Sequence, residues 1–138
     1  MGRFLRLEHL GIAVADLNKA NRLFQLLSDS APYKTEEVAS EAVTTSFFKV
    51  GESKIELVQS NNPTGAISRF IEKKGEGIHH VAFEVENIFL EMEKLRAAGF
   101  ELIQDQPKEG ADNKLICFVH PRSTGGILVE LTQEKPQS

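Results

Sequence analysis

The sequence predicts an α+β fold made of two similar halves, each with the element order strand–helix–strand–strand–strand. A motif around His9 (EHLGIAV) returns around His80 (HHVAFEV), 71 positions later. A second motif around Glu56 (GESKIELVQ) returns around Glu130 (GGILVELTQ), 74 positions later. Repeat architectures usually need three or more copies, so a two-fold repeat instead indicates two halves that close on a shared surface.

The two histidine motifs read as strands with one bulky apolar face and one face where the histidine stands among mostly small residues. Successive strand side chains point to opposite faces. The bulky faces carry Leu10, Ile12 and Val14 in the first copy and Val81, Phe83 and Val85 in the second. The other faces carry His9, Gly11 and Ala13, and His80, Ala82 and Glu84. Room beside each histidine predicts a cavity.

Length, composition and charge are those of one globular domain. The chain has 138 residues, 41% hydrophobic and 26% charged, which is ordinary for a soluble protein. The net charge of −4 argues against a general nucleic-acid surface. Cys117 is the only cysteine, which excludes a disulfide framework and a thiolate metal site. We expect no secretory signal, no membrane span and a cytoplasmic location.

The first half contains a strand, a capped helix and three further strands. Asp16 is the expected N-cap of the helix. Apolar residues at helical spacing predict its buried stripe, namely Leu17, Ala20, Phe24 and Leu27. The predicted strands are 5–14, 33–38, 43–50 and 54–59. A connecting helix over about 64–74, stopped by Gly75, follows.

The second half repeats this order. Asn87 is the expected cap of a helix that ends at Gly99 and turns Ile88, Met92 and Leu95 inward. The predicted strands are 77–85, 100–103, 114–119 and 127–133, with a polar loop over 104–112. The expected organisation is one domain, 1–138, with module one over about 5–60 and module two over about 77–133.

The repeat identifies four candidate metal-ligating residues: His9, Glu56, His80 and Glu130. Two imidazoles and two carboxylates suit a divalent ion such as Mn, Co, Ni or Zn. One strand histidine is more often structural, and one strand glutamate is normally solvated. Two independent copies of both favour a metal site.

The remaining histidines and the cysteine have structural interpretations. His79 points to the apolar face in this register. His120 precedes a proline in a turn, where a capping role is expected. Cys117 is expected to be a small core residue.

Several stretches together resemble the vicinal oxygen chelate superfamily and, more closely, the methylmalonyl-CoA epimerase family. They are HLGIAV, VGESKIELVQ, GEGIHHVAFEV and FVHPRSTGGILVELTQ. The HPRSTGG turn resembles the epimerase signature, in which the position of Arg122 is usually lysine, whereas the glyoxalase I branch typically has Asp-Pro-Asp-Gly. The resemblance implies paired βαβββ modules that form a cupped, mostly antiparallel eight-stranded sheet around a metal site, with helices on the outer face. It implies His9, His80 and Glu130 as ligands, with Glu56 as the fourth.

The reaction that this resemblance implies interconverts (2R)- and (2S)-methylmalonyl-CoA through a metal-stabilised enolate, within propionate metabolism. Glu130 is implied as one acid/base group. Some family members place a second glutamate on the third strand, where this chain has Thr44 or Thr45. Glu37 and Glu41 lie upstream, and Glu56 or a water could also serve, so the second group stays open.

The resemblance also implies an acyl-CoA partner and a homodimer, in which modules pair within or between chains. Lys114, Arg122 and Ser123 are candidates for the substrate carboxylate or the CoA phosphates, with a solvated loop as an equal alternative.

Two other functions remain open from the sequence. One is a glyoxalase I-type isomerase (lactoylglutathione lyase) acting on a glutathione hemithioacetal. The other is a metal-free small-molecule-binding protein of the same fold. An extradiol dioxygenase is disfavoured, because those enzymes use redox-active iron and usually have longer chains.

Overall fold

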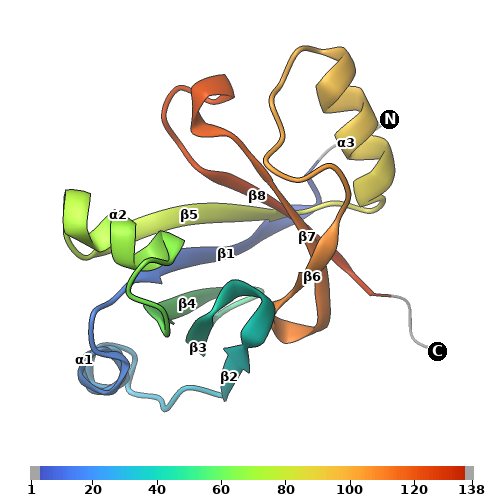
Figure 1. Ribbon diagram of the computed structural model, residues 1–138. Coiled ribbons are helices and arrows are strands. Elements are labelled where there is room, and N and C mark those ends of the chain that lie inside the picture. Colours follow the sequence, from blue (N-terminus) through green and yellow to red (C-terminus); the bar gives the residue numbers. More distant parts are fainter. Residues whose placement is uncertain (1–3, 136–138) are drawn as a thin grey trace. The chain divides into compact units, whose positions relative to one another are not determined.

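The computed structural model describes residues 4–135, which divide into two compact units (Figure 1). The first unit comprises residues 9–79. The second unit comprises residues 80–135 together with residues 4–8. Their element order confirms the predicted α+β class and the repeated βαβββ pattern. A single domain over 1–138 remains a prediction.

The first unit contains a four-stranded sheet with the order β2-β3-β4-β1. Its parallel pair joins β1 and β4, and the other neighbours are antiparallel. The strands are β1 (Arg6–Ala13, in this sheet from His9 onward), β2 (Lys34–Val38), β3 (Val43–Val50) and β4 (Ser53–Ser60). The helices are α1 (Leu17–Ser28), η1 (Ala39–Glu41) and α2 (Ala66–Lys74).

The second unit repeats this arrangement with the order β5-β8-β7-β6, in which only β5 and β8 are parallel. The strands are β5 (Gly77–Glu84), β6 (Lys108–Gly110), β7 (Lys114–Val119) and β8 (Val129–Glu134). The helices are α3 (Ile88–Ala97), η2 (Ala111–Asn113) and η3 (Pro121–Ser123).

The N-termini of α1 and α3 are capped in the same way. The Asp16 carboxylate accepts from the Lys19 N–H, and the Asn87 amide oxygen accepts from the Leu90 N–H, both at 3.1 Å. These side chains satisfy donors that a helix leaves unpaired in its first turn. Both predicted caps are therefore confirmed.

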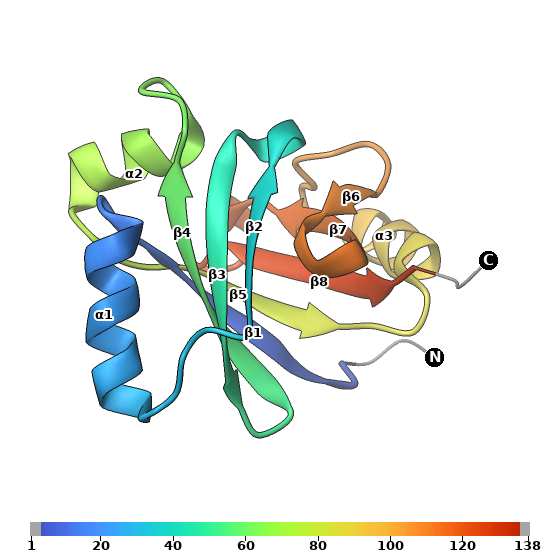
Figure 2. The same ribbon diagram turned by 90° about the horizontal axis from the view of Figure 1, so that it is seen from below.

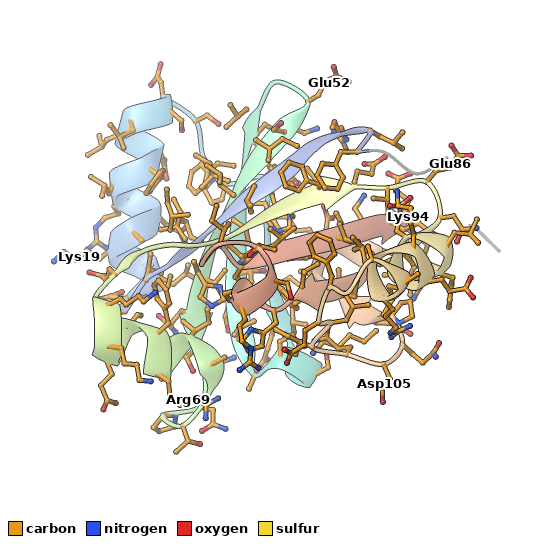
Figure 3. All side chains as sticks on the ribbon, turned by 90° about the horizontal axis from the view of Figure 1, so that it is seen from above. Lys19, Glu52, Arg69, Glu86, Lys94 and Asp105 are labelled. Atoms are coloured by element: carbon orange, nitrogen blue, oxygen red, sulfur yellow. The ribbon has the colours of Figure 1, made fainter. Side chains whose placement is uncertain are left out.

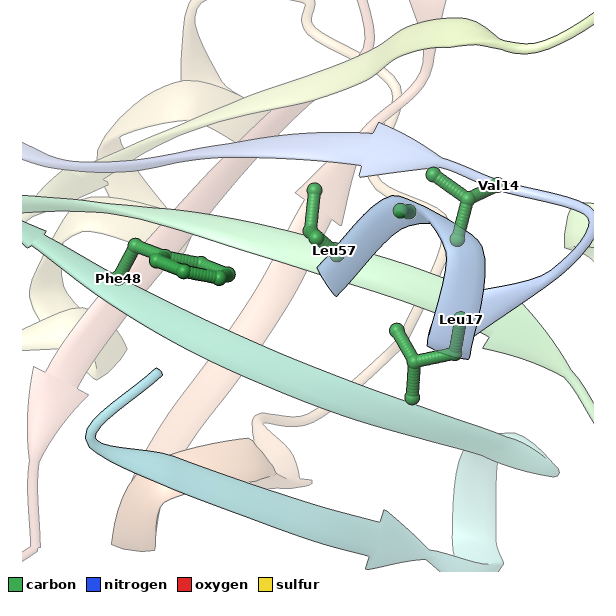
Figure 4. Packing of buried hydrophobic residues seen from close by; sticks show 5 residues of the cluster. Val14, Leu17, Phe48 and Leu57 are labelled. Atoms are coloured by element: carbon green, nitrogen blue, oxygen red, sulfur yellow. The ribbon is translucent and has the colours of Figure 1, made fainter. Parts of the chain in front are cut away.

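The core of the first unit lies between α1 and the sheet. Figure 4 shows Leu17 and Val14 packed beside Leu57 and Phe48. Leu27, predicted to point inward, is instead 71% exposed. It stands about 80° from Leu17 around the helix axis and so lies at the margin of the buried stripe.

The core of the second unit lies under α3, beside β7 and β8. Ile88 and Met92 are buried there, and Leu95 packs against them, as predicted. Cys117 and Leu131 complete the cluster from the sheet. Cys117 is fully buried in this cluster, which confirms its expected core role. The same burial raises the pKa of its thiol to about 12.

One predicted strand is in the wrong place. Residues 100–103 contribute only the single bridge Leu102–Val119, and the edge strand is β6, inside the predicted polar loop. A Cβ atom added at Gly110 would lie 2.8 Å from Cδ1 of Ile116. The glycine therefore allows β6 to approach β7.

Charged side chains project outward from both units, as the labelled examples in Figure 3 show: Lys19, Glu52, Arg69, Glu86, Lys94 and Asp105. Figure 2 shows α1 running alongside β4 in the first unit. No helix within residues 4–135 combines the length and the apolar run that crossing a bilayer requires.

Candidate metal centre

The first unit places His9 beside Glu56. The β1–β4 register sets Gly11 opposite Glu56, so His9 and Glu56 project from the same face of the sheet, here called the His9 face. The His9 Nε2 atom lies 3.1 Å from Oε1 of Glu56. Both residues are buried, at 5% and 6% exposure.

The second unit builds the same pair from His80 and Glu130. The β5–β8 register sets Ala82 opposite Glu130, so both pair members share one face, the His80 face. The His80 Nε2 atom lies 3.1 Å from Oε1 of Glu130, and both residues are buried.

The neighbours of the two glutamates are also duplicated. Each glutamate has a small residue on one side, Gly11 or Ala82, and a phenylalanine on the other, Phe47 or Phe118. Phe118 also meets the His80 ring edge-on, with 5.8 Å between centroids. We did not predict these phenylalanines, although they recur at the histidine spacing of 71 residues. The cavity beside each histidine remains a prediction.

The donor atoms in each pair fit a divalent ion. Imidazole nitrogens and carboxylate oxygens are common ligands of divalent ions. In each unit the two donor atoms lie 3.1 Å apart, so both could contact one ion. Buried carboxylates need a compensating positive charge, which an ion or a protonated imidazole supplies.

The model of the Glyoxalase/Bleomycin resistance protein/Dioxygenase superfamily matches residues 8–118. The chain belongs to this superfamily. An uncharacterised protein of Bacillus subtilis is 35% identical over 130 residues, covering 94% of this chain and 93% of that protein. The ethylmalonyl-CoA/methylmalonyl-CoA epimerase of Cereibacter sphaeroides is also 35% identical over 130 residues, covering 93% and 97%.

A solved structure agrees with these matches. A Streptomyces coelicolor methylmalonyl-CoA epimerase variant, in complex with 2-nitronate-propionyl-CoA, superposes with a TM-score of 0.93 at 26% identity. The superposition covers 97% of this chain and all of that one. The predicted resemblance to vicinal oxygen chelate proteins, and within them to methylmalonyl-CoA epimerases, is confirmed.

The three predicted substrate-binding residues of this superfamily member have carboxylate or backbone partners within the second unit. Lys114 is buried, and its Nζ lies 3.2 Å from Oε1 of Glu134. Arg122 donates two hydrogen bonds to the Glu101 carboxylate, at 3.2 and 3.0 Å. The Ser123 hydroxyl accepts from the Glu101 N–H at 2.9 Å. These contacts give all three a structural role, and their substrate role remains a prediction.

The two other histidines have the structural roles that were predicted. The His79 ring packs edge-on against Phe70 of α2, with 4.9 Å between centroids. Nδ1 of His120 accepts from the Arg122 N–H at 3.0 Å and so caps η3.

We did not predict a role for two glutamines, Gln59 and Gln133, that lie near the ends of the strands carrying Glu56 and Glu130. The Gln59 side chain accepts from the Leu17 N–H, and the Gln133 side chain from the Ile88 N–H, both at 2.7 Å. Each glutamine follows its site glutamate by three positions and connects that strand to its helix. The signal was present in the sequence, because both glutamines end the duplicated motifs.

Proposed function

We propose that this enzyme is a metal-dependent epimerase that interconverts (2R)- and (2S)-methylmalonyl-CoA. The duplicated His–Glu pair, with 3.1 Å between donor atoms in each copy, carries the proposal. The similarity to curated epimerases and to an epimerase bound to an acyl-CoA analogue supports the substrate class.

In this proposal both pairs hold one divalent ion, with ligands His9, Glu56, His80 and Glu130. Imidazole and carboxylate donors suit Co, Mn, Ni or Zn. Such an ion would act as a Lewis acid toward the negative charge that develops on the substrate oxygens.

The substrate proton at C2 is acidic because it lies between a thioester and a carboxylate. Glu130 has Oε1 beside His80, so we assign its carboxylate the removal and return of that proton on one face of C2. His80 orients the carboxylate through the same contact. Inversion also requires an acid/base group on the opposite face.

The substrate contacts, assembly and location in this proposal are those that the family resemblance implies. The substrate is an acyl-CoA, and Lys114, Arg122 and Ser123 form its carboxylate or phosphate contacts. Arg122 can exchange partners, because its side chain is 70% exposed. A cytoplasmic homodimer acting in propionate metabolism completes the proposal.

The test follows deuterium at C2 and the ratio of epimers when (2S)-methylmalonyl-CoA is incubated with metal-loaded protein in D2O. We expect exchange and inversion in the wild type, and loss of both by at least about 100-fold in His80→Ala. His79→Ala is the matched control, because this neighbouring histidine packs against Phe70.

Three outcomes would contradict the proposal. Wild-type protein without C2 exchange would exclude the epimerase. Turnover of methylglyoxal with glutathione instead would indicate the glyoxalase I-type isomerase. Unchanged ligand binding after metal removal, without turnover, would indicate a binding protein.

A further inference from the structure

The proposed function leaves one chemical requirement open, and the further inference rests on it. Epimerisation moves a proton from one face of C2 to the other, so a single fixed carboxylate cannot complete it. If Glu130 serves one face, another group must serve the other, and the first unit contains candidate carboxylates.

The strand register of the first unit decides which carboxylates face the site. Paired residues on neighbouring strands share a face. Lys34 pairs with Phe47, which pairs with Glu56. Two residues further along β2, Glu36 pairs with Thr45, so Glu36 also belongs to the His9 face.

The other upstream candidates are placed differently. Glu37 pairs with Thr44 and therefore projects from the opposite face. Glu41 lies in η1, outside the strands. Among residues 9–13, 34–38, 43–50 and 53–60, Glu36 and Glu56 are the carboxylates on the His9 face.

We propose that Glu36 is the second acid/base residue of the reaction. Position 45 on β3 is a threonine in this chain. The carboxylate in this proposal is instead that of Glu36, which pairs with Thr45 from the neighbouring strand β2. Neighbouring strands lie about 4.8 Å apart, so β2 is about 10 Å from β4. Glu36 and Glu56 therefore stand two strands apart on the same face of this sheet.

The surroundings of Glu36 suit a group that must exchange its proton. Its side chain is 29% exposed, against 8% for Glu56, so solvent water reaches its carboxylate. Nζ of Lys34 lies 3.3 Å from its Oε1 and orients the carboxylate. The Thr45 hydroxyl donates to the Glu36 carbonyl at 3.4 Å, which ties the edge strand to β3.

The proton balance is complete with these two residues. Glu130 takes the C2 proton, and the electrons of the broken C–H bond move into the enolate. Protonated Glu36 then gives its proton to the opposite face of C2, where the enolate electrons form the new bond. Glu130 ends protonated and Glu36 ionised, and exchange with water restores both. The reverse reaction exchanges the two roles.

The experiment compares Glu36→Gln with Glu37→Gln, the adjacent residue on the opposite face. Each variant receives (2R)- or (2S)-methylmalonyl-CoA separately in D2O. We expect Glu36→Gln to lose inversion by at least about 100-fold, yet to exchange the C2 proton of one epimer with its configuration retained. Glu37→Gln is expected to exchange and invert both epimers like the wild type.

A second variant separates catalysis from structure. Glu36→Ala leaves space beside C2, so added acetate is expected to restore inversion in a concentration-dependent manner. Wild-type inversion in Glu36→Gln would overturn the assignment, as would equal loss of exchange from both epimers or the absence of acetate rescue. A wild-type protein that neither exchanges nor inverts would instead overturn the proposed function.

Discussion

A buried carboxylate raises the free energy of the folded protein unless a partner compensates it, and each buried site glutamate has a histidine 3.1 Å away. The pairing repeats because the strands present His and Glu on the same face beside a small residue. At the residue scale, each His–Glu contact therefore compensates a buried carboxylate and holds together two donor atoms of the proposed metal site.

The Glu101–Arg122 pair predicts a pH effect in the turn after β7. The hydrogen bond from Arg122 lowers the pKa of Glu101. Because the pKa of Glu101 is lower in the folded state than in the unfolded state, the pair stabilises the fold when the pH is above the unfolded-state pKa. This stabilisation is lost as the pH falls through the folded-state pKa. In an NMR titration, Arg122→Gln is expected to raise the Glu101 pKa toward its usual value.

Lys94→Gln is the control for this titration, because Lys94 pairs with Glu91 on α3. It should leave the Glu101 pKa unchanged. A Glu101 pKa that does not move in Arg122→Gln would show that the ion pair is not its cause.

A second residue-scale prediction concerns the core of the first unit. Leu57 is fully buried, so Leu57→Ala is expected to lower the free energy of unfolding by about 3 kcal/mol through lost contacts and a cavity. Leu26→Ala, at an 84% exposed position, should change it by less than about 0.5 kcal/mol. Urea denaturation measures both, and equal effects would refute this description of the core.

At the scale of elements, the duplicated glutamines couple each site strand to its helix. Gln59 and Gln133 stand near the ends of β4 and β8 and accept from the first residues of α1 and α3. They add to the caps provided by Asp16 and Asn87. Strand position and helix start are therefore fixed together in each unit.

Removing one of these acceptors tests the coupling. Gln59→Leu leaves the Leu17 N–H without this partner, so the free energy of unfolding is expected to fall by about 1 kcal/mol. Gln25→Leu, on the exposed side of α1, is the matched control and should have little effect. Equal urea midpoints for Gln59→Leu and the wild type would argue against a capping role.

At the scale of the whole molecule, a ligand bound only by the folded state increases stability by mass action. If both His–Glu pairs hold one ion, a free metal concentration about 100-fold above Kd adds about 2.7 kcal/mol to the free energy of unfolding. We therefore expect Co, Mn, Ni or Zn to raise the melting temperature, and a chelator to reverse the shift.

His9→Ala and His80→Ala each remove one ligand from a different unit, and His79→Ala removes none of the proposed set. We expect both ligand variants to lose the metal-induced shift and His79→Ala to keep it. A shift that persists after loss of one unit's histidine would mean that the two pairs do not share an ion.

Much of the fold could be predicted from local patterns. Period-two alternation placed His9, His80 and both glutamates on defined strand faces, and Asp16 and Asn87 identified the helix starts. The repeat spacing then related His9 to His80 and Glu56 to Glu130. These signals are local periodicity and internal repetition, and both can be read from one sequence.

The pairing between strands that are distant in the sequence could not be predicted from these patterns. The β6 edge strand depends on the fit of Gly110 against Ile116, and local β propensity favoured residues 100–103 instead. The difference between Glu36 and Glu37 also depends on register, because a shift of one residue exchanges the two faces of a strand.

The sequence by itself determined the paired modules, the strand faces and the four candidate ligands, because each follows from periodicity and internal repetition. Only the tertiary structure decided that β6 forms at 108–110, that the two glutamines cap the helices, and that Glu36 shares the His9 face. Those features depend on which backbone atoms meet across strands, and hydrogen-bond register is a property of the folded sheet.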